Sequence, residues 1–178
     1  IVKTVVKDNK AAIVEVNSET DFVAKNDEFQ GFVETVVNQI VDSEAADMDA
    51  FMAEAWAADT TKTVKDALVE KIAVIGENLN IRRFEKVTNE NGVIASYIHA
   101  GGKIGVLVNM DTTASAETVE ECGKNVCMQV AALNPKYTNR NEVSADFIEH
   151  EKGILMAQIQ NDPKEASKPA KVIEGMIN

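Results

Sequence analysis

Glu15, Glu19 and Asp21 place three carboxylates in one short stretch, where they could act as acid and base or bind a hard cation. Either role needs the carboxylates to converge on one site. Glu15 belongs to an expected strand, Asp21 lies beyond it, and no histidine is near in the sequence. Ser18 and Asp21 also have the spacing of a helix capping box, which explains Asp21 without chemistry, and Asn26 is a second candidate N-cap. We therefore expect no catalytic cluster here.

Phe22 is the unusual residue of the same stretch, because it sets a large apolar side chain, followed by Val23, among acidic and polar neighbours. A phenylalanine side chain gains about 1.5–3 kcal/mol when it leaves water. Phe22 must therefore tuck under its own loop or wait for the pocket of a partner. The pattern leaves both alternatives open, and the choice between them decides the function of the stretch.

One further motif resembles a functional site but fits a structural role better. Gly101-Gly102-Lys103 suggests a phosphate-binding loop, but the earlier glycine is missing and Ile104 stands where Ser or Thr would hold Mg²⁺. The two glycines fit a tight hairpin turn. The sequence contains no GxSxG-like turn and no Cys-His pair, so nothing supports nucleophilic catalysis.

The histidines and cysteines do not predict a metal site. His99 and His150 stand alone, without ligand spacing to a cysteine or to each other. Cys122 and Cys127 lie on different sides of an expected helix and lack the CxxC spacing. We interpret them as buried, inert thiols, and we expect a reduced, intracellular chain that works in the cytoplasm without a metal or other cofactor.

The composition excludes several classes of function. The 178 residues carry a formal net charge of −11, which argues against a protein that coats nucleic acid, because phosphate binding depends on Lys and Arg. Arg82-Arg83 is the only pair of adjacent arginines. No run approaches the roughly 18 apolar residues of a membrane span. We expect no direct contact with nucleic acid or with a membrane, and nothing in the sequence indicates homo-oligomerisation.

An internal repeat of pattern organises the chain. Two pairs of β-branched runs, each pair separated by a turn, predict two β-hairpins: residues 1–6 with 12–16, and residues 93–99 with 104–108. An offset of 93 positions, which sets Lys10 against Lys103, aligns the two turns. The same offset brings the helices that follow into phase, matching three pairs: Val33 with Val126, Val37 with Val130, and Ile40 with Leu133.

The repeat predicts an α+β fold of two related subdomains with antiparallel sheets and packed helices. We expect a first subdomain over residues 1–92, a second over residues 93–143, and a protruding helical hairpin over residues 144–178. Residues 81–87 alternate weakly and could add a third strand to the second hairpin.

Apolar spacing predicts further helices between the two hairpins. One covers residues 48–58 and carries Phe51 and Trp56. Another covers residues 61–80, with Gly76 inside its apolar stripe. Glycine costs about 1 kcal/mol relative to alanine within a helix. Gly76 is therefore either tolerated near the helix end or needed for the close approach of another backbone.

The stretch over residues 15–25, EVNSETDFVAK, resembles the signature of bacterial and organellar translation elongation factor Ts and matches it at every position. The likeness continues in family order through residues 75–83 (IGENLNIRR), 96–99 (SYIH) and 104–108 (IGVLV), and reaches residues 172–175 (VIEG). It covers nearly the whole chain.

Members of this family are nucleotide-exchange factors for elongation factor Tu, the GTPase that delivers aminoacyl-tRNA. The resemblance implies two α+β core subdomains, a helical coiled-coil hairpin, and action by protein–protein binding rather than as an enzyme. It also implies that the Phe22 ring fills an apolar pocket of the GTPase domain, and that His99 touches a β-barrel domain of the partner. The residues it assigns to partner contacts are Asp21, Phe22, Val23, Ile75, Gly76 and His99.

The family's N-terminal three-helix domain and its final strand have no counterpart in this sequence, so we interpret the chain as a core fragment. Two rival functions remain beside nucleotide exchange. One is an enzyme that uses the acidic loop and a metal. The other is a non-catalytic assembly module of the translation apparatus, with the helical hairpin as its main contact.

Overall fold

The computed structural model describes residues 1–177. Two antiparallel β-hairpins are its main β-structures. The first hairpin joins β1 (Val2–Lys7) to β2 (Lys10–Asn17), and the second joins β6 (Gly92–His99) to β7 (Ile104–Asp111). Both hairpins and both turns are confirmed, and so is the α+β class. The chain divides into two compact units, Ile1–Asn134 and Pro135–Asn178.

The strand β5 (Asn80–Thr88) corrects one prediction, because it pairs with β2 of the first hairpin and not with the second hairpin. The resulting sheet has the order β1-β2-β5. The pairing places Ile81 opposite Val16 in the buried core. It also places Glu15 beside Arg82 and Arg83, which donate to its carboxylate at 2.8 and 2.7 Å. Apolar burial on one face and ion pairs on the other therefore fix the register.

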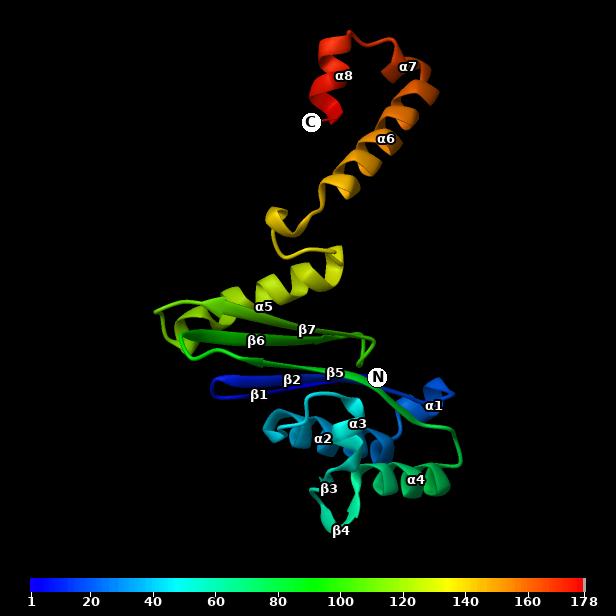
Figure 1. Ribbon diagram of the computed structural model, residues 1–178, viewed down its shortest axis with the longest axis vertical. Coiled ribbons are helices and arrows are strands. Elements are labelled where there is room, and N and C mark those ends of the chain that lie inside the picture. Colours follow the sequence, from blue (N-terminus) through cyan, green and yellow to red (C-terminus); the bar gives the residue numbers. More distant parts are fainter. Residues whose placement is uncertain (178) are drawn as a thin grey trace. The chain divides into compact units, whose positions relative to one another are not determined.

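The first unit is built in four layers (Figure 1). The long helix α2 (Asp27–Asp42) covers one face of the β1-β2-β5 sheet, and the β6-β7 hairpin packs against β1 and β2. The helix α5 (Ala116–Leu133) covers β6 and β7. The main core lies between α2 and the first sheet, where alternate residues of β2 meet the apolar face of α2. Its most buried members include Val14, Val16, Phe29, Val33, Val36, Val37 and Ile40.

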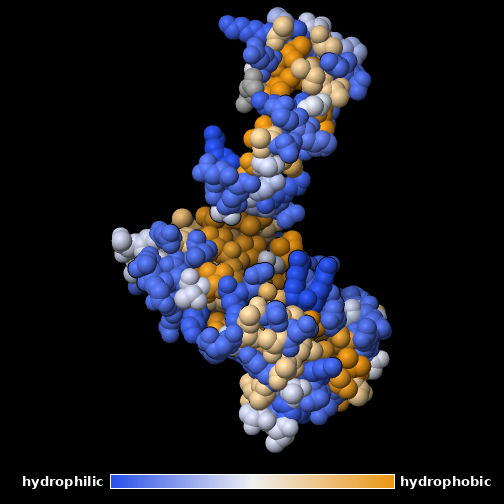
Figure 2. Space-filling model, in the orientation of Figure 1, coloured by the Kyte–Doolittle hydropathy of each residue, from blue (hydrophilic) through white to orange (hydrophobic). Residues whose placement is uncertain are grey.

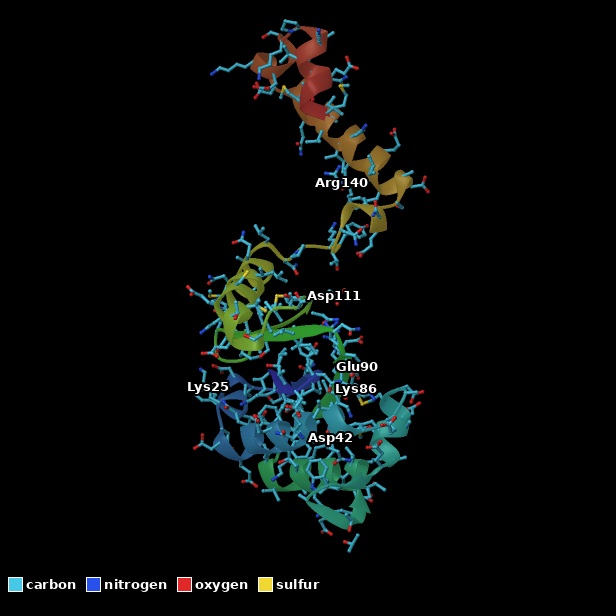
Figure 3. The ribbon with its side chains drawn as sticks, turned by 90° about the vertical axis from the view of Figure 1, so that its left-hand side faces the viewer. Lys25, Asp42, Lys86, Glu90, Asp111 and Arg140 are labelled. Carbon is cyan, nitrogen blue, oxygen red and sulfur yellow. The ribbon has the colours of Figure 1, made fainter. Side chains whose placement is uncertain are left out.

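Two lysines tie the C-terminal end of α2 and the residues after it to the sheet (Lys86 and Asp42 are labelled in Figure 3). Lys86 of β5 donates to the carbonyls of Ser43 and Ala45 at 2.8 and 2.9 Å. Asp42, at the end of α2, accepts a hydrogen bond from Lys7 of β1 at 2.6 Å. These contacts hold both edges of the sheet to the same helix end.

The helix expected over residues 48–58 is shorter in the structure. It forms α3 (Met48–Ala53), and the chain then turns into the small hairpin of β3 (Ala55–Trp56) and β4 (Asp59–Thr63). Glu54 ends the helix, because its carbonyl accepts from Val64 N at 2.9 Å. Trp56 then packs its ring 5.6 Å from the ring of Phe32 in α2. Tertiary contacts therefore override the helical spacing of Trp56.

The helix expected over residues 61–80 is confined to α4 (Val64–Ile75). Its N-cap is Thr63, whose hydroxyl accepts from the Asp66 N–H while its own N–H donates to the Asp66 carboxylate, a capping box. It ends before Gly76, so Leu79 lies outside the helix although its side chain is buried.

The 93-position offset aligns the hairpin turns but not the buried faces of the two helices. Val33 of α2 is fully buried, whereas its match Val126 in α5 is 40 % exposed, and Leu133 is 68 % exposed. The buried residues of α5 are Gly123 and Cys127, and Cys127 lies one position after Val126. The physical reason is Gly123, where an added Cβ would lie 2.7 Å from the Cβ of Ala95. Its absence lets the Gly123–Cys127 side of α5 approach the second hairpin.

The second unit is helical. It contains the short 3₁₀ helix η1 (Arg140–Glu142), then α6 (Ala145–Asn161), α7 (Pro163–Ala166) and α8 (Ala170–Ile177). Ser144 caps α6, and α8 folds back onto α6 as a hairpin (Figure 1). Ile159 is buried, but apolar side chains of α6 and α8 remain partly exposed among the polar surface (Figure 2): Ile148, Ile154, Leu155, Met156, Val172 and Met176. Among the described residues, no helix combines the length and the apolar content that crossing a membrane requires.

The Glu15 ion pairs generate a prediction about acid stability. The hydrogen bond from Arg82, helped by Arg83, lowers the pKa of Glu15 from its usual 4.5 to about 2. Because the folded-state pKa is depressed, this stabilisation is complete above about pH 4.5 and is lost as the pH falls toward 2. We expect Glu15→Gln to lower the free energy of unfolding by about 1–3 kcal/mol at pH 7, and the difference to vanish toward pH 2.

Urea denaturation at several pH values measures this difference. Glu85→Gln removes an exposed carboxylate from the same sheet and controls for the change in net charge. A difference between wild type and Glu15→Gln that stays constant from pH 7 to pH 2.5 contradicts the interpretation.

Candidate functional site

Phe22 lies on α1 (Asp21–Ala24), a single helical turn directly before α2. The N-cap of α1 is Thr20, whose hydroxyl accepts from Val23 N at 3.4 Å. The expected capping box from Ser18 is wrong, because the Ser18 hydroxyl instead donates to the Thr20 carbonyl at 3.1 Å. The alternative N-cap, Asn26, begins α2. One cap for each helix therefore sets α1 and α2 as two separate segments.

The Phe22 side chain does not tuck under its own loop. It is 82 % exposed, the highest fraction among the exposed large apolar residues that the structure describes. The next residue, Val23, is half-buried and packs against the main core. Because adjacent residues of a helix face different directions, inward packing of Val23 turns Phe22 outward. The short helix therefore displays an aromatic ring to solvent.

Asp21 is an ionised surface group and forms no acid–base pair. Its carboxylate accepts from Lys25 at 3.0 Å, one helical turn later (Lys25 is labelled in Figure 3). The pKa of Asp21 lies below its usual value because Lys25 donates this hydrogen bond and adds its positive charge, with a smaller contribution from the charge of Lys103. A carboxylate held ionised in this way can accept hydrogen bonds from a partner.

Gly76 ends α4 in the left-handed conformation, with φ of +79°. Its N–H donates to the Ile72 carbonyl at 2.8 Å, which closes the last turn of the helix. A Cβ at this position would meet no atom of the described chain within 4 Å, so the backbone conformation, rather than close packing, calls for glycine. The glycine therefore stands at the helix end and not inside the helix. Ile75, just before it, is half-buried and packs against the core, while Gly76 is exposed.

Glu77 connects the segment before α1, which carries Phe22, to the end of α4, and its role was not predicted from the sequence. One of its carboxylate oxygens accepts from the backbone N–H groups of Glu19 and Thr20, both at 3.1 Å. The other accepts from the Thr20 hydroxyl at 2.5 Å. The pKa of Glu77 is lowered, first by the Thr20 side chain and then by the two backbone donors. The only available signal in the sequence was its place directly after Gly76 within the family-like motif.

His99 belongs to the second hairpin, at the end of β6. Its ring Nδ1 lies 2.8 Å from the Tyr97 hydroxyl, and the ring is exposed. Its carbonyl accepts from the N–H groups of Gly102 and Lys103, at 3.2 and 3.1 Å, in the turn between the strands. Lys103 is the group whose charge also acts on Asp21. Lys103 thus lies near enough to Asp21 for its charge to help lower the pKa of that carboxyl slightly.

The arrangement offers contacts for binding. An exposed aromatic ring, an ionised carboxylate and an exposed helix end lie on segments that Glu77 connects. Among residues 1–177, no group of three or more His, Cys, Asp or Glu side chains is placed to hold a metal ion. Burial raises the pKa of the Cys127 thiol, so this cysteine is a poor nucleophile, and Cys122, on the same helix, is exposed and not buried as expected.

The conformation of Gly76 generates a prediction with an internal control. Gly76→Ala forces a Cβ into the left-handed region, so we expect the free energy of unfolding to fall by about 1–2 kcal/mol. Gly31→Ala, within α2, also adds a methyl group that meets no atom within 4 Å, and it should raise stability by about 0.5–1 kcal/mol. Urea denaturation of both variants compares them, and equal effects of the two substitutions would contradict the conformational role of Gly76.

Comparison with known proteins places this sequence in a family. The family model for "Elongation factor TS" matches residues 19–178. The elongation factor Ts of Clostridioides difficile is 46 % identical over 167 residues, covering 94 % of this chain and 53 % of that protein. That of Trichlorobacter lovleyi is 44 % identical over 174 residues, covering 96 % and 56 %. That of Clostridium tetani is 41 % identical over 179 residues, covering 99 % and 59 %.

The chain thus spans a little more than half the length of the curated relatives it matches. Both segments of the candidate site, α1 with Phe22 and the end of α4 with Gly76, lie inside the matched region. The chain belongs to the elongation factor Ts family.

Proposed function

We propose that this chain binds the translation GTPase elongation factor Tu in the cytoplasm and promotes the release of GDP from it. Membership of the elongation factor Ts family supports a role in translation elongation. The observation that carries the proposal is the 82 % exposure of Phe22 on a short helix anchored by its neighbour Val23. A large apolar side chain held in water in this way is typical of an anchor at a protein interface.

The proposed mechanism needs no covalent step, because nucleotide exchange is a problem of linked binding equilibria. A protein that prefers the nucleotide-free GTPase weakens the binding of GDP to the GTPase. GDP weakens the binding of that protein to the GTPase by the same ratio. Each tenfold loss of GDP affinity requires about 1.4 kcal/mol of differential binding. Burial of the Phe22 ring in a pocket that opens only without GDP would supply about 1.5–3 kcal/mol, or one to two such steps.

The other candidate residues have supporting roles in this mechanism. Asp21 would orient the contact by accepting hydrogen bonds, and Val23 would anchor α1 to the core. Ile75 and Gly76 would form a second contact with the GTPase domain at the end of α4. His99 would reach a further domain of the partner from the second hairpin.

The test is the release of a fluorescent GDP analogue from elongation factor Tu, with this chain and with Phe22→Ala. We expect the wild-type chain to accelerate release, and Phe22→Ala to reduce the maximal rate by about tenfold or more, since about 1.5–3 kcal/mol of burial is lost. Because Phe22 is largely exposed, its removal should change the free energy of unfolding by less than about 0.5 kcal/mol.

Leu133→Ala is the matched control, because it removes another exposed apolar side chain, from α5. We expect it to exchange like wild type. If Phe22→Ala accelerates GDP release as well as wild type does, the wedge mechanism is wrong.

A second candidate function, a non-catalytic assembly module, is favoured by the apolar side chains that α6 and α8 leave exposed. Deletion of residues 144–178 separates the two functions. Under the exchange mechanism, the deletion should weaken the acceleration of GDP release without abolishing it, because the Phe22 segment lies in the other unit. Under the assembly function, a pull-down with elongation factor Tu should lose all binding.

A further inference from the structure

The helix that carries Phe22 is too small to hold its own position. α1 has four residues and none of them is buried. An isolated helical turn is unstable in water, because ordering its backbone costs more than its few hydrogen bonds return. Its internal ion pair, Asp21–Lys25, is exposed on both sides and contributes little. The placement of Phe22 must therefore come from contacts outside α1.

Val23 supplies apolar packing against the core, and Glu77 supplies polar contacts. Its carboxylate accepts three hydrogen bonds from the two residues that lead into α1, two from the backbone of Glu19 and Thr20 and one from the Thr20 hydroxyl. Hydrogen bonds to an ionised carboxylate are stronger than neutral ones. The lowered pKa of Glu77, caused first by the Thr20 side chain, agrees with a carboxylate that stays ionised at neutral pH.

Glu77 lies directly after α4, so its contact with Thr20 connects two parts of the candidate site. Gly76 reverses the backbone at the end of α4 through its positive φ, and Glu77 is the first residue after that reversal. The same carboxylate thus links the end of α4 to the N-cap of α1. The segments of Phe22 and Gly76, more than 50 positions apart in the sequence, are thus joined by direct hydrogen bonds through one side chain.

We propose that Glu77 is a positioning residue, which holds the Phe22 helix against the end of α4 so that Phe22 and Gly76 meet a partner as one preformed surface. The part of this inference that concerns the partner rests on the proposed exchange function. The part that concerns the order of α1 stands on the geometry of the chain alone.

The inference has a kinetic signature. Without Glu77, the Phe22 helix would occupy its binding arrangement for only a fraction of the time. The apparent association constant for the partner would be multiplied by that fraction. Once bound, the partner would hold the helix in place, so the maximal exchange rate would stay the same. Loss of Phe22 itself would instead lower the maximal rate.

The experiment compares Glu77→Ala, Glu77→Gln and the control Asp66→Ala in the full 178-residue chain. Asp66 is a matched carboxylate at the other end of α4, where it accepts from the backbone and hydroxyl of Thr63 at 3.0 and 2.8 Å. Amide hydrogen exchange of Glu19, Thr20 and Val23, measured on the chain without any partner, reports the order of α1. Titration of each variant into elongation factor Tu loaded with a fluorescent GDP analogue gives the half-saturating concentration and the maximal rate.

For Glu77→Ala we expect amide exchange at Glu19 and Thr20 to accelerate about tenfold or more, since charge-assisted hydrogen bonds are lost there. We expect the half-saturating concentration to rise about tenfold with a maximal rate within twofold of wild type. Glu77→Gln keeps one acceptor oxygen and should fall between wild type and Glu77→Ala. Asp66→Ala should lower the melting temperature without changing either readout.

Three results would overturn the inference. The first is unchanged amide exchange at Glu19 and Thr20 in Glu77→Ala. The second is a half-saturating concentration within twofold of wild type. The third is an equal shift in Asp66→Ala, which would mean that any loss of stability in α4 has the same effect. If the wild-type chain fails to accelerate GDP release, the proposed function fails, while the amide-exchange comparison still decides the role of Glu77.

Discussion

The apolar face of α2, packed on the β1-β2-β5 sheet, is the constraint from which the position of the candidate site follows. Phe29 is fully buried in the first turn of α2, so the start of this helix cannot move without opening the core. Only Lys25 and Asn26 separate that start from α1. The helix α4, whose end carries the second segment of the site, also packs against α2. Both segments of the site therefore adjoin the same helix, whose apolar face is buried.

The site combines a support that is packed on the core with an exposed contact residue. Val23 faces the core and Phe22 faces solvent, although the two are neighbours in sequence and similar in hydrophobicity. Exposure of Phe22 forgoes about 1.5–3 kcal/mol that burial would contribute to folding. That free energy stays available for binding, and an aromatic ring on an ordered support binds with less loss of conformational entropy than one on a disordered loop. The packing of Val23 and the hydrogen bonds of the Glu77 carboxylate together supply this order at α1.

Local patterns predicted those features that depend on local physics. The β-branched runs and the turn between the runs of each pair specified both hairpins, since a turn and its flanking strands are close in sequence. The start of α2 at Asn26 was among the predicted caps. The exposure of Phe22 could be stated only as one of two alternatives, because nothing in the sequence says which surface covers a side chain.

The features that sequence reasoning missed depend on contacts between distant residues. The position of Trp56 in β3 follows from its packing on Phe32, and no pattern near Trp56 reports that partner. The pairing of β5 with β2 depends on the burial of Ile81 opposite Val16 and on the two arginines that meet Glu15. The contact of Glu77 with Thr20 joins residues that are 57 positions apart, so its role was invisible until the fold brought them together.

The most direct test of exchange by linked binding is the affinity of this chain for elongation factor Tu, measured by calorimetry with and without GDP. We predict that saturating GDP weakens binding of the chain by at least about tenfold, or 1.4 kcal/mol. Saturating chain should weaken GDP binding by the same factor. Equal affinities of the chain for the GDP-bound and nucleotide-free GTPase would contradict the mechanism, because a ligand without differential affinity cannot displace the nucleotide.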